Sequence, residues 1–173
     1  MTAAIENFET PRLRASRISL EDFDDLYHLL TDPLVAATLG DIPDELQVRQ
    51  ALNRAIEHWD RHGFGIWSFR SKANRQFVGR AGLRHQEIAG QREIELLYTI
   101  AASEWRKGLA TEMARAIVSV AFEKLHLSEI VAITLATNIA SRRVLEHVGF
   151  EYERDVSWAG RRHVLYRRFF AKF

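Results

Sequence analysis

The stretch that decides the fold reads ELLYTIAASEWRKGLATEMARAIVSVAFEKL, from Glu95 to Leu125. Its first part alternates side chains with a period of two, which is typical of a strand. After a short basic loop, apolar residues recur at spacings of three and four from Ala110 to Leu125, which predicts a long amphipathic helix. The stretch therefore predicts a strand, a loop and a helix whose apolar stripe packs against a sheet.

The residues before this stretch predict two helices and a meander of three strands. Ser19, followed by acidic residues, indicates a helix start, and we expect that helix to run to about Leu30 and to end at Thr31-Asp32-Pro33. A second helix is expected to open at 41–44 and to end at 62–65. We also expect a short extended segment at 13–18 and, from period-two patterns, antiparallel strands at 66–69, 77–83 and 94–100.

The residues after this stretch complete the predicted sheet. The β-branched run at 130–135 predicts a strand that lies parallel to the one at 94–100, because a helix connects them. Thr137-Asn138 then caps a short helix that Gly149 ends. A closing hairpin is predicted at 150–157 and 162–169. These elements predict the α/β class: a mixed sheet with flanking helices in a single domain over residues 1–173.

The composition is that of an ordinary globular protein. The chain has 173 residues, 47% of them hydrophobic and 27% charged, and no cysteine. The lack of cysteine excludes disulfides, thiolate metal sites and a cysteine nucleophile. No stretch is apolar enough for a membrane span, so we expect a cytoplasmic location and no membrane partner. A net charge of +1 argues against nucleic acid as a partner, although the arginines between 142 and 168 leave a local basic patch open.

Trp105 to Glu112 has the composition of an anion-binding loop. The N–H groups at a helix start have no intrahelical partner, and the helix dipole favours negative charge there. Gly108 and Ala110 leave room for a pyrophosphate to approach the backbone, and Arg106 and Lys107 add positive charge. The loop lacks the glycine spacings of dinucleotide and NTP sites. Small and basic residues are also common at helix starts, so the loop alone does not identify the ligand.

A second motif lies downstream of this loop, and the two motifs together indicate more than the loop does alone. Asn138 and Ser141 open the short helix, and Gly149-Phe150 follow it. The order of strand, basic glycine loop, long helix, β-branched strand, N-x-x-S and G-F resembles the GNAT superfamily of N-acetyltransferases. Trp105 to Glu112 is similar to the W-G-K-G-Y-A-T-E stretch of the branch that contains the ribosomal-protein N-terminal (Rim-type) acetyltransferases. The resemblance extends upstream to 31–33 and 78–83.

The resemblance implies a GNAT-like fold whose two central parallel strands splay apart and hold acetyl-CoA, the coenzyme A thioester, in the gap. Backbone groups of Tyr98, Thr99 and Ile100 would bind the pantetheine arm as if it were another strand, and Asn138 would fix that arm. The pyrophosphate would be held by the amides of Arg106, Lys107, Gly108, Leu109, Ala110 and Thr111.

An amine that attacks a thioester needs a base, an oxyanion donor and an acid for the departing thiolate. Period-two geometry places Glu93 and Glu95 on one face of their strand, and Glu95 aligns with the glutamate of the branch's E-I-G-Y pattern. We therefore expect Glu95 to be the general base, its pKa raised by burial beside another carboxylate, with Glu93 as second choice. The alternative is a solvent-facing strand glutamate paired with an arginine.

The sequence indicates the acid that protonates the departing thiolate less directly than it indicates the base. Leu145 stands where many relatives have a tyrosine that protonates the thiolate, which leaves Ser141 as the expected acid. A backbone N–H of Tyr98 or a neighbour would serve as the oxyanion donor.

The acceptor pocket is expected to be walled by Phe64, Trp67 and His85, with Trp158 as a further candidate. Aromatic residues at strand positions are also typical of a core, and a lone histidine near a strand end is often a surface residue. No histidine pair shows convincing metal-ligand spacing, so we expect no metal.

The sequence thus predicts an acyltransferase: an acetyl-CoA-dependent N-acetyltransferase that acts by direct attack in a ternary complex. The acceptor is a primary amine, either a protein N-terminus or a small molecule. The alternative is a coenzyme A-binding sensor or regulatory protein without turnover, which Leu145 favours. A third reading is an RNA- or ribosome-binding module that uses the C-terminal arginines. The identity of the acceptor and the oligomeric state, including a homodimer, stay open.

Overall fold

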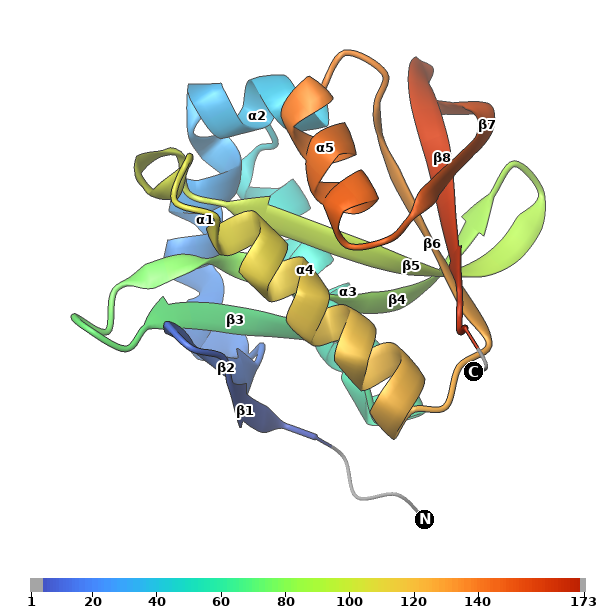
Figure 1. Cartoon of the computed structure of the whole chain (residues 1–173). Coiled ribbons are helices and arrows are strands. Elements are labelled where there is room, and N and C mark those ends of the chain that lie inside the picture. The colour runs from blue at the N-terminus through green and yellow to red at the C-terminus, as the bar shows by residue number, and fades with distance from the viewer. Residues whose placement is uncertain (1–4, 172–173) are drawn as a thin grey trace.

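The computed structural model describes residues 5–171 and shows one eight-stranded mixed sheet (Figure 1). The strands lie in the order β1-β2-β3-β4-β5-β6-β8-β7. Among the described strands, β5 and β6 are the only parallel neighbours. This confirms the predicted α/β class and its single parallel pair. The bounds are β1 Asn7–Glu9, β2 Leu13–Arg17, β3 Ile66–Ser71, β4 Phe77–Ile88, β5 Gln91–Ile100, β6 Glu129–Leu135, β7 Glu151–Trp158 and β8 Arg161–Phe169.

Helices cover both faces of this sheet. In Figure 1, α4 crosses in front of β4 and β5, whereas α1 and α3 lie behind the sheet. The bounds are α1 Phe23–Thr31, α2 Pro33–Leu39, α3 Glu45–His62, α4 Leu109–Ser119 and α5 Ile139–His147, with 3₁₀ turns at Leu20–Asp22 and Ala102–Glu104 and a π-helical turn, Val120–Lys124, that continues α4. Within residues 5–171, no helix is both long and apolar enough to cross a membrane.

α4 forms where the apolar spacing in the sequence predicts it. Its buried side chains are Leu109, Met113, Ala114, Ile117 and Val118, and they belong to the main core. Complete burial of a large aliphatic side chain contributes about 1.5–3 kcal/mol, so this face supplies most of the stability of a helix that is only 11 residues long. The core therefore fixes where α4 begins, and with it the loop that precedes the helix.

The sequence patterns missed two elements, α2 and β1, and predicted β3, β4 and β5 shorter than they are. Thr31-Asp32-Pro33 ends α1 as predicted, but α2 begins directly after it. Asp32 accepts a hydrogen bond from the Leu34 N–H at 2.8 Å, and Pro33 takes the first helical turn, where its missing N–H costs nothing. The short edge strand β1 was not predicted, and β4 and β5 extend beyond their predicted bounds into a hairpin that turns at Ala89-Gly90.

β5 and β6 pair at one position and then diverge. Glu95 lies opposite Val131, whereas β5 continues to Ile100 and β6 to Leu135. Past Glu95, the edge of β5 that faces β6 has no strand partner within the described part of the chain. The backbone groups of every second residue along that edge are therefore open to another partner, except the Ile100 carbonyl, which accepts a hydrogen bond from Trp105 Nε1.

Glu112, in the first turn of α4, ties the N-terminal strands to the loop before the helix. Its carboxylate accepts hydrogen bonds from Thr10 Oγ1 at 2.6 Å and from the Arg12 N–H at 2.8 Å, and it pairs with Arg12 Nε at 2.6 Å. Arg12 also donates to the carbonyl oxygen of Lys107 at 2.8 Å. Burial raises the pKa of Glu112, but these hydrogen bonds outweigh burial and the pKa is lowered overall.

We predict that Glu112→Gln lowers the free energy of unfolding by about 1–2 kcal/mol at neutral pH, because the amide loses charge-assisted hydrogen bonds. Since folding lowers the pKa of Glu112, its contribution is complete above the ordinary value of 4.5 and is lost as the pH falls through the folded value. Urea titrations of wild type and variant at about pH 7 and about pH 3 measure this difference. A difference that does not shrink at the lower pH would contradict the assignment.

Candidate functional site

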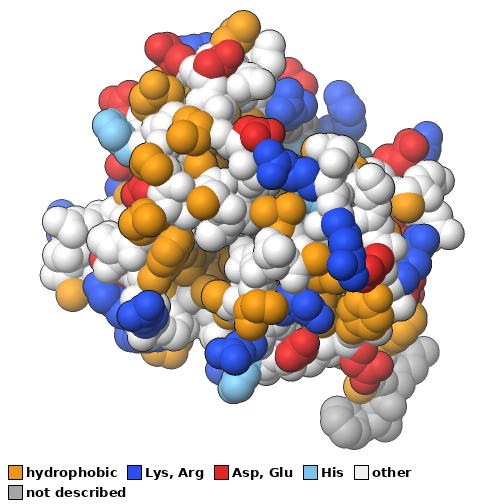
Figure 2. Space-filling view, turned by 90° about the horizontal axis from the view of Figure 1, so that it is seen from above, with side chains coloured by type: hydrophobic (Ala, Val, Ile, Leu, Met, Phe, Trp, Pro, Cys, Tyr) orange, Lys and Arg blue, Asp and Glu red, His pale blue; other side chains and the backbone are white. Residues whose placement is uncertain are grey.

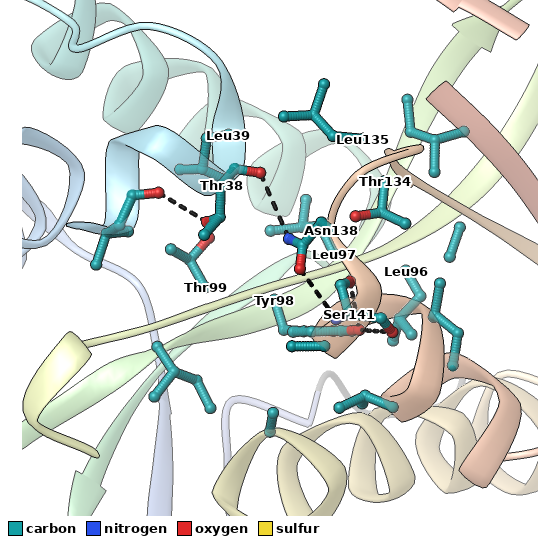
Figure 3. A pocket seen from close by; sticks show the side chains of 18 of the residues that line it. Thr38, Leu39, Leu96, Leu97, Tyr98, Thr99, Thr134, Leu135, Asn138 and Ser141 are labelled. Carbon is teal, nitrogen blue, oxygen red and sulfur yellow. Dashed lines mark hydrogen bonds between the residues drawn. The ribbon is translucent and has the colours of Figure 1, made fainter. Parts of the chain in front are cut away.

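A cavity of about 800 Å³ opens where β5 and β6 diverge. Figure 2 shows the face that carries α2 and α5, where apolar side chains surround a hollow and Lys and Arg side chains lie near it. Figure 3 shows the walls from close by. The predicted site residues that line the cavity are Glu95, Tyr98, Thr99, Ile100, Arg106, Gly108, Leu109, Ala110, Thr111, Asn138 and Ser141. The fold thus brings together the predicted catalytic and cofactor residues, with the exception of Lys107.

The loop before α4 presents free backbone amides to this cavity. Gly108 is the N-cap residue of α4, with a left-handed φ of 75°, and no side chain caps the helix. The first N–H groups of the helix therefore lack a partner within it. Arg106 also has a positive φ, 62°. A Cβ added to Gly108 would meet only Arg12 Nη2, at 3.6 Å. The site therefore combines unpaired donors, the positive end of a helix dipole and open space above Gly108.

Two side chains hold this loop in place. The indole Nε1 of Trp105 donates to the carbonyl oxygen of Ile100 at 3.0 Å, which folds the loop back onto the end of β5. Arg12 holds the carbonyl of Lys107 from the other side. Lys107 itself pairs with Glu104 at 3.0 Å on the surface. Of the two basic residues of the loop, Arg106 lines the cavity and Lys107 does not.

Asn138 joins α5 to α2 across the cavity. Its Oδ1 accepts from the Ser141 N–H at 3.1 Å, which caps α5 as the sequence predicts. Its Nδ2 donates to the Thr38 carbonyl at 3.5 Å, so the amide also spans to the end of α2 (Figure 3). Both ends of this side chain are therefore engaged, and α2, which the sequence patterns did not predict, supplies part of the wall.

Tyr98 and Ser141 form a pair that the sequence patterns did not reveal. Tyr98 Oη lies 2.9 Å from Ser141 Oγ and 3.1 Å from the Ser141 carbonyl oxygen (Figure 3). Burial raises the pKa of Tyr98, so its hydroxyl stays protonated at neutral pH. Leu145 is 1% exposed and carries no proton. β5 thus places the Tyr98 hydroxyl against α5, the helix that carries Leu145.

Glu95 lies at the point where the two strands part. Its side chain is buried, and Oε2 accepts a hydrogen bond from Arg84 Nε at 2.7 Å. Among the described residues, Oε1 has no hydrogen-bond partner in the chain. The expectation that Glu95 lies beside a second carboxylate is not met in these contacts, because its neighbour is a guanidinium. Glu95 is therefore a buried carboxylate with one oxygen engaged and one available.

Glu93, two residues before Glu95 on β5, lies in a different environment from that of Glu95. Both of its carboxylate oxygens pair with Arg167, at 2.7 and 3.1 Å. Arg167 also contacts Glu129 and Glu153, and its hydrogen bonds to Glu93 and Glu153 raise its pKa. Glu93 does not line the cavity. This cluster joins β5 to β8, so that of the two strand glutamates only Glu95 lines the cavity.

Arg80 is a further polar residue of the cavity, and the motif reasoning did not single it out. It lies opposite Thr99 in the β4–β5 register and lines the cavity. Its Nε is buried and has no hydrogen-bond partner in the described chain. Burial lowers the pKa of Arg80 to about 10, which still leaves the guanidinium charged. A buried donor without a partner is uncommon in proteins and suits an oxygen of a bound molecule.

The three predicted acceptor-pocket walls lie outside this cavity. Trp67 is 0% exposed and packs against Trp59 in the core. Phe64 and His85 contact each other beside the end of α3. The signal for them was aromatic character alone, which is also typical of cores. Trp158, the further candidate, does line the cavity, together with Arg161 and His163 of the closing hairpin.

Comparison with known proteins agrees with this geometry. Residues 12–151 match the acetyltransferase (GNAT) domain family. The chain is similar to two Bacillus subtilis proteins: YkkB, 29% identical over 148 residues (85% of this chain, 86% of YkkB), and YoaA, an uncharacterized N-acetyltransferase, 28% identical over 149 residues (84% and 82%). A RimL ribosomal L7/L12 alpha-N-protein acetyltransferase in complex with coenzyme A shares the fold, with a TM-score of 0.79 and 14% identity over 95% of this chain and 98% of that chain. The chain therefore belongs to the GNAT family of acetyltransferases.

Proposed function

We propose that this protein is an acetyl-CoA-dependent N-acetyltransferase that acetylates a primary amine by direct attack in a ternary complex. The observation that carries the proposal is one continuous cavity that joins three features: the uncapped start of α4, the unpaired edge of β5 and the buried carboxylate of Glu95. The GNAT family, to which the chain belongs, uses acetyl-CoA. The cavity therefore contains an anion site at the start of α4, an open strand edge along β5 and a proton acceptor at Glu95.

The residues present fit this cofactor. The amides from Arg106 to Thr111 would hold the pyrophosphate, because the helix start is uncapped and Gly108 leaves the approach open. Backbone groups of Tyr98 and the Ile100 N–H would pair with the amides of the pantetheine arm along the free edge of β5, whereas the N–H and C=O of Thr99 face β4. Asn138 lies at the other wall of the cavity, where it would border the arm.

The chemistry requires three groups of the protein. Bound acetyl-CoA supplies an activated acetyl group. Glu95 takes the proton from the acceptor ammonium, directly or through one water, with Oε1, because Arg84 holds Oε2. A backbone N–H of Tyr98 or a neighbour stabilises negative charge on the acetyl oxygen. Ser141 gives a proton to the departing sulfur and regains one from solvent, and the Tyr98 hydroxyl, 2.9 Å from Ser141 Oγ, orients the serine hydroxyl.

The position of Arg80 indicates which class of amine the site would accept. Arg80 and Thr99 are register partners on β4 and β5, as are Arg84 and Glu95, so by period-two geometry all four lie on the same face of the sheet. An acceptor whose amine reaches Glu95 from that face would place its neighbouring atoms near the unpaired Arg80 Nε. This arrangement favours amines with a carbonyl or carboxylate oxygen close to the nitrogen, as in a peptide N-terminus.

We predict that Gly108→Val abolishes the rise in melting temperature that acetyl-CoA produces in the wild type by binding the native state. A valine side chain would occupy the space above the free amides, and φ of 75° is also strained for it. Each variant is therefore compared with its own ligand-free melting temperature. Gly90→Val, at φ of 80° in the β4–β5 turn, is the matched control and should keep the full shift. A full shift in Gly108→Val would remove this loop from the cofactor site.

We predict that Ser141→Ala lowers kcat by about a hundredfold, the lower end of the range for general acid catalysis, while the affinity for acetyl-CoA changes little. Tyr98→Phe should lower kcat less, because Ser141 keeps its own proton and loses only the hydroxyl that orients it. Steady-state kinetics and acetyl-CoA titrations separate the two effects. An unchanged kcat in Ser141→Ala would show that the thiolate leaves without this hydroxyl.

The decisive experiment is a screen of amines, including peptides with free N-termini, that follows thiol release from acetyl-CoA. With the best acceptor, we predict that Glu95→Gln lowers kcat by about two to four orders of magnitude near neutral pH. Glutamine keeps the size of the side chain but cannot take a proton. Acetyl-CoA affinity should barely change.

Glu93→Gln is the matched control, because it removes a buried ion pair on the same strand but no cavity carboxylate. A normal kcat in Glu95→Gln would sink the assignment of the base. If acetyl-CoA binds and no amine releases thiol, the protein is the coenzyme A-binding sensor that Leu145 favours.

A further inference from the structure

Three histidines gather at the end of α3, away from the cavity. His58 and His62 are four residues apart on the helix, so they lie on one face of it. His85 reaches the same place from β4. One ring nitrogen of each lies within 4.8 Å of the others. The expectation that no histidine pair has metal-ligand spacing overlooked the helical pair, and the third histidine could not be located from the sequence.

The distances suit a shared metal ion. His58 Nε2 lies 3.1 Å from His85 Nδ1. Two nitrogens that bind one tetrahedral Zn²⁺ at about 2.0–2.1 Å lie about 3.3 Å apart, so this pair is already at the required separation. The His62 ring lies 4.5 Å from the His58 ring and 4.2 Å from the His85 ring, between centroids. Because the side chain of His62 is exposed, a rotation can bring its nitrogen onto the same ion.

His58 is oriented as a metal ligand is. Its Nδ1 lies 2.9 Å from the Phe64 carbonyl oxygen, which can only accept, so Nδ1 carries the proton and Nε2 presents its lone pair as an acceptor. Metal binds the neutral imidazole, and the contact with Phe64 makes Nε2 the ligand atom of His58.

The lone pair on His58 Nε2 already accepts a hydrogen bond within the protein. The His85 backbone N–H donates to His58 Nε2 at 3.0 Å, at a point on β4 beyond its last register pair with β3, Ile66 with Gly82. A metal ion would displace this hydrogen bond. The N–H can then bond to water, because the cluster lies at the surface.

We propose that His58, His62 and His85 form a binding site for a divalent transition metal ion, with Zn²⁺ as the expected occupant. Three imidazoles and no thiolate match the preferences of Zn²⁺, Ni²⁺ and Cu²⁺ and exclude Mg²⁺ or Ca²⁺ as a fitting ion. Water completes the tetrahedral set. The ion would join the end of α3 to β4 and stabilise that contact.

The test uses the full chain after treatment with a chelator. Calorimetric titration with ZnCl₂ should give one ion per chain, and Zn²⁺ should raise the melting temperature. Visible absorption with Co²⁺ should show the intense bands of a four-coordinate site. His62→Gln is the most informative variant because its side chain is exposed, and it should weaken Zn²⁺ binding at least about tenfold.

His147→Gln, an exposed histidine at the end of α5, is the matched control and should bind as the wild type does. His85→Gln should lose affinity as His62→Gln does. If the wild type shows no saturable binding of one ion, or if His62→Gln binds Zn²⁺ as tightly as the wild type, the cluster is only a hydrogen-bonded cap on the edge of β4 and the proposal is wrong.

Discussion

β5 and β6 run side by side at Glu95 and Val131 and part beyond that pair. A strand that loses its neighbour leaves N–H and C=O groups open, and a buried backbone group without a partner costs about 1–3 kcal/mol. This edge must therefore be covered by water or by a bound molecule. The cavity exists because of the divergence, and the residues that border it are those the divergence separates.

The gap is held open by contacts between segments that are far apart in the chain. Asn138 links the start of α5 to the end of α2. Arg161 in the closing hairpin pairs with Asp41, after α2, at 2.6 Å. Arg12 and Glu112 fix the start of α4 from the N-terminal strands. These contacts lie around the cavity and not within the main core, so the core stabilises the fold while a polar rim determines the width of the gap.

Local patterns predicted the elements that depend on local spacing, and they failed where distant contacts decide. The apolar stripe of α4 and the caps at Asp44 and Asn138 are readable from a few neighbouring residues. α2 had a readable signal too, since Asp32-Pro33 is a cap followed by a first helical turn. The Tyr98–Ser141 pair had none, because 43 residues separate its members. Family resemblance pointed to the loop before α4 as the proposed cofactor site, but it could not show which aromatic residues face the cavity.

Glu93 and Glu95 show why residue type and burial do not identify a catalytic carboxylate. Both side chains are largely buried, at 11% and 4% exposed, and each meets an arginine. Arg167 binds both oxygens of Glu93, and Glu93 does not line the cavity. Arg84 holds one oxygen of Glu95, at the position where β6 turns away and the cavity begins. A general base needs an accessible lone pair more than it needs distance from charged side chains. The divergence of β5 and β6 leaves an oxygen of Glu95 accessible from the cavity.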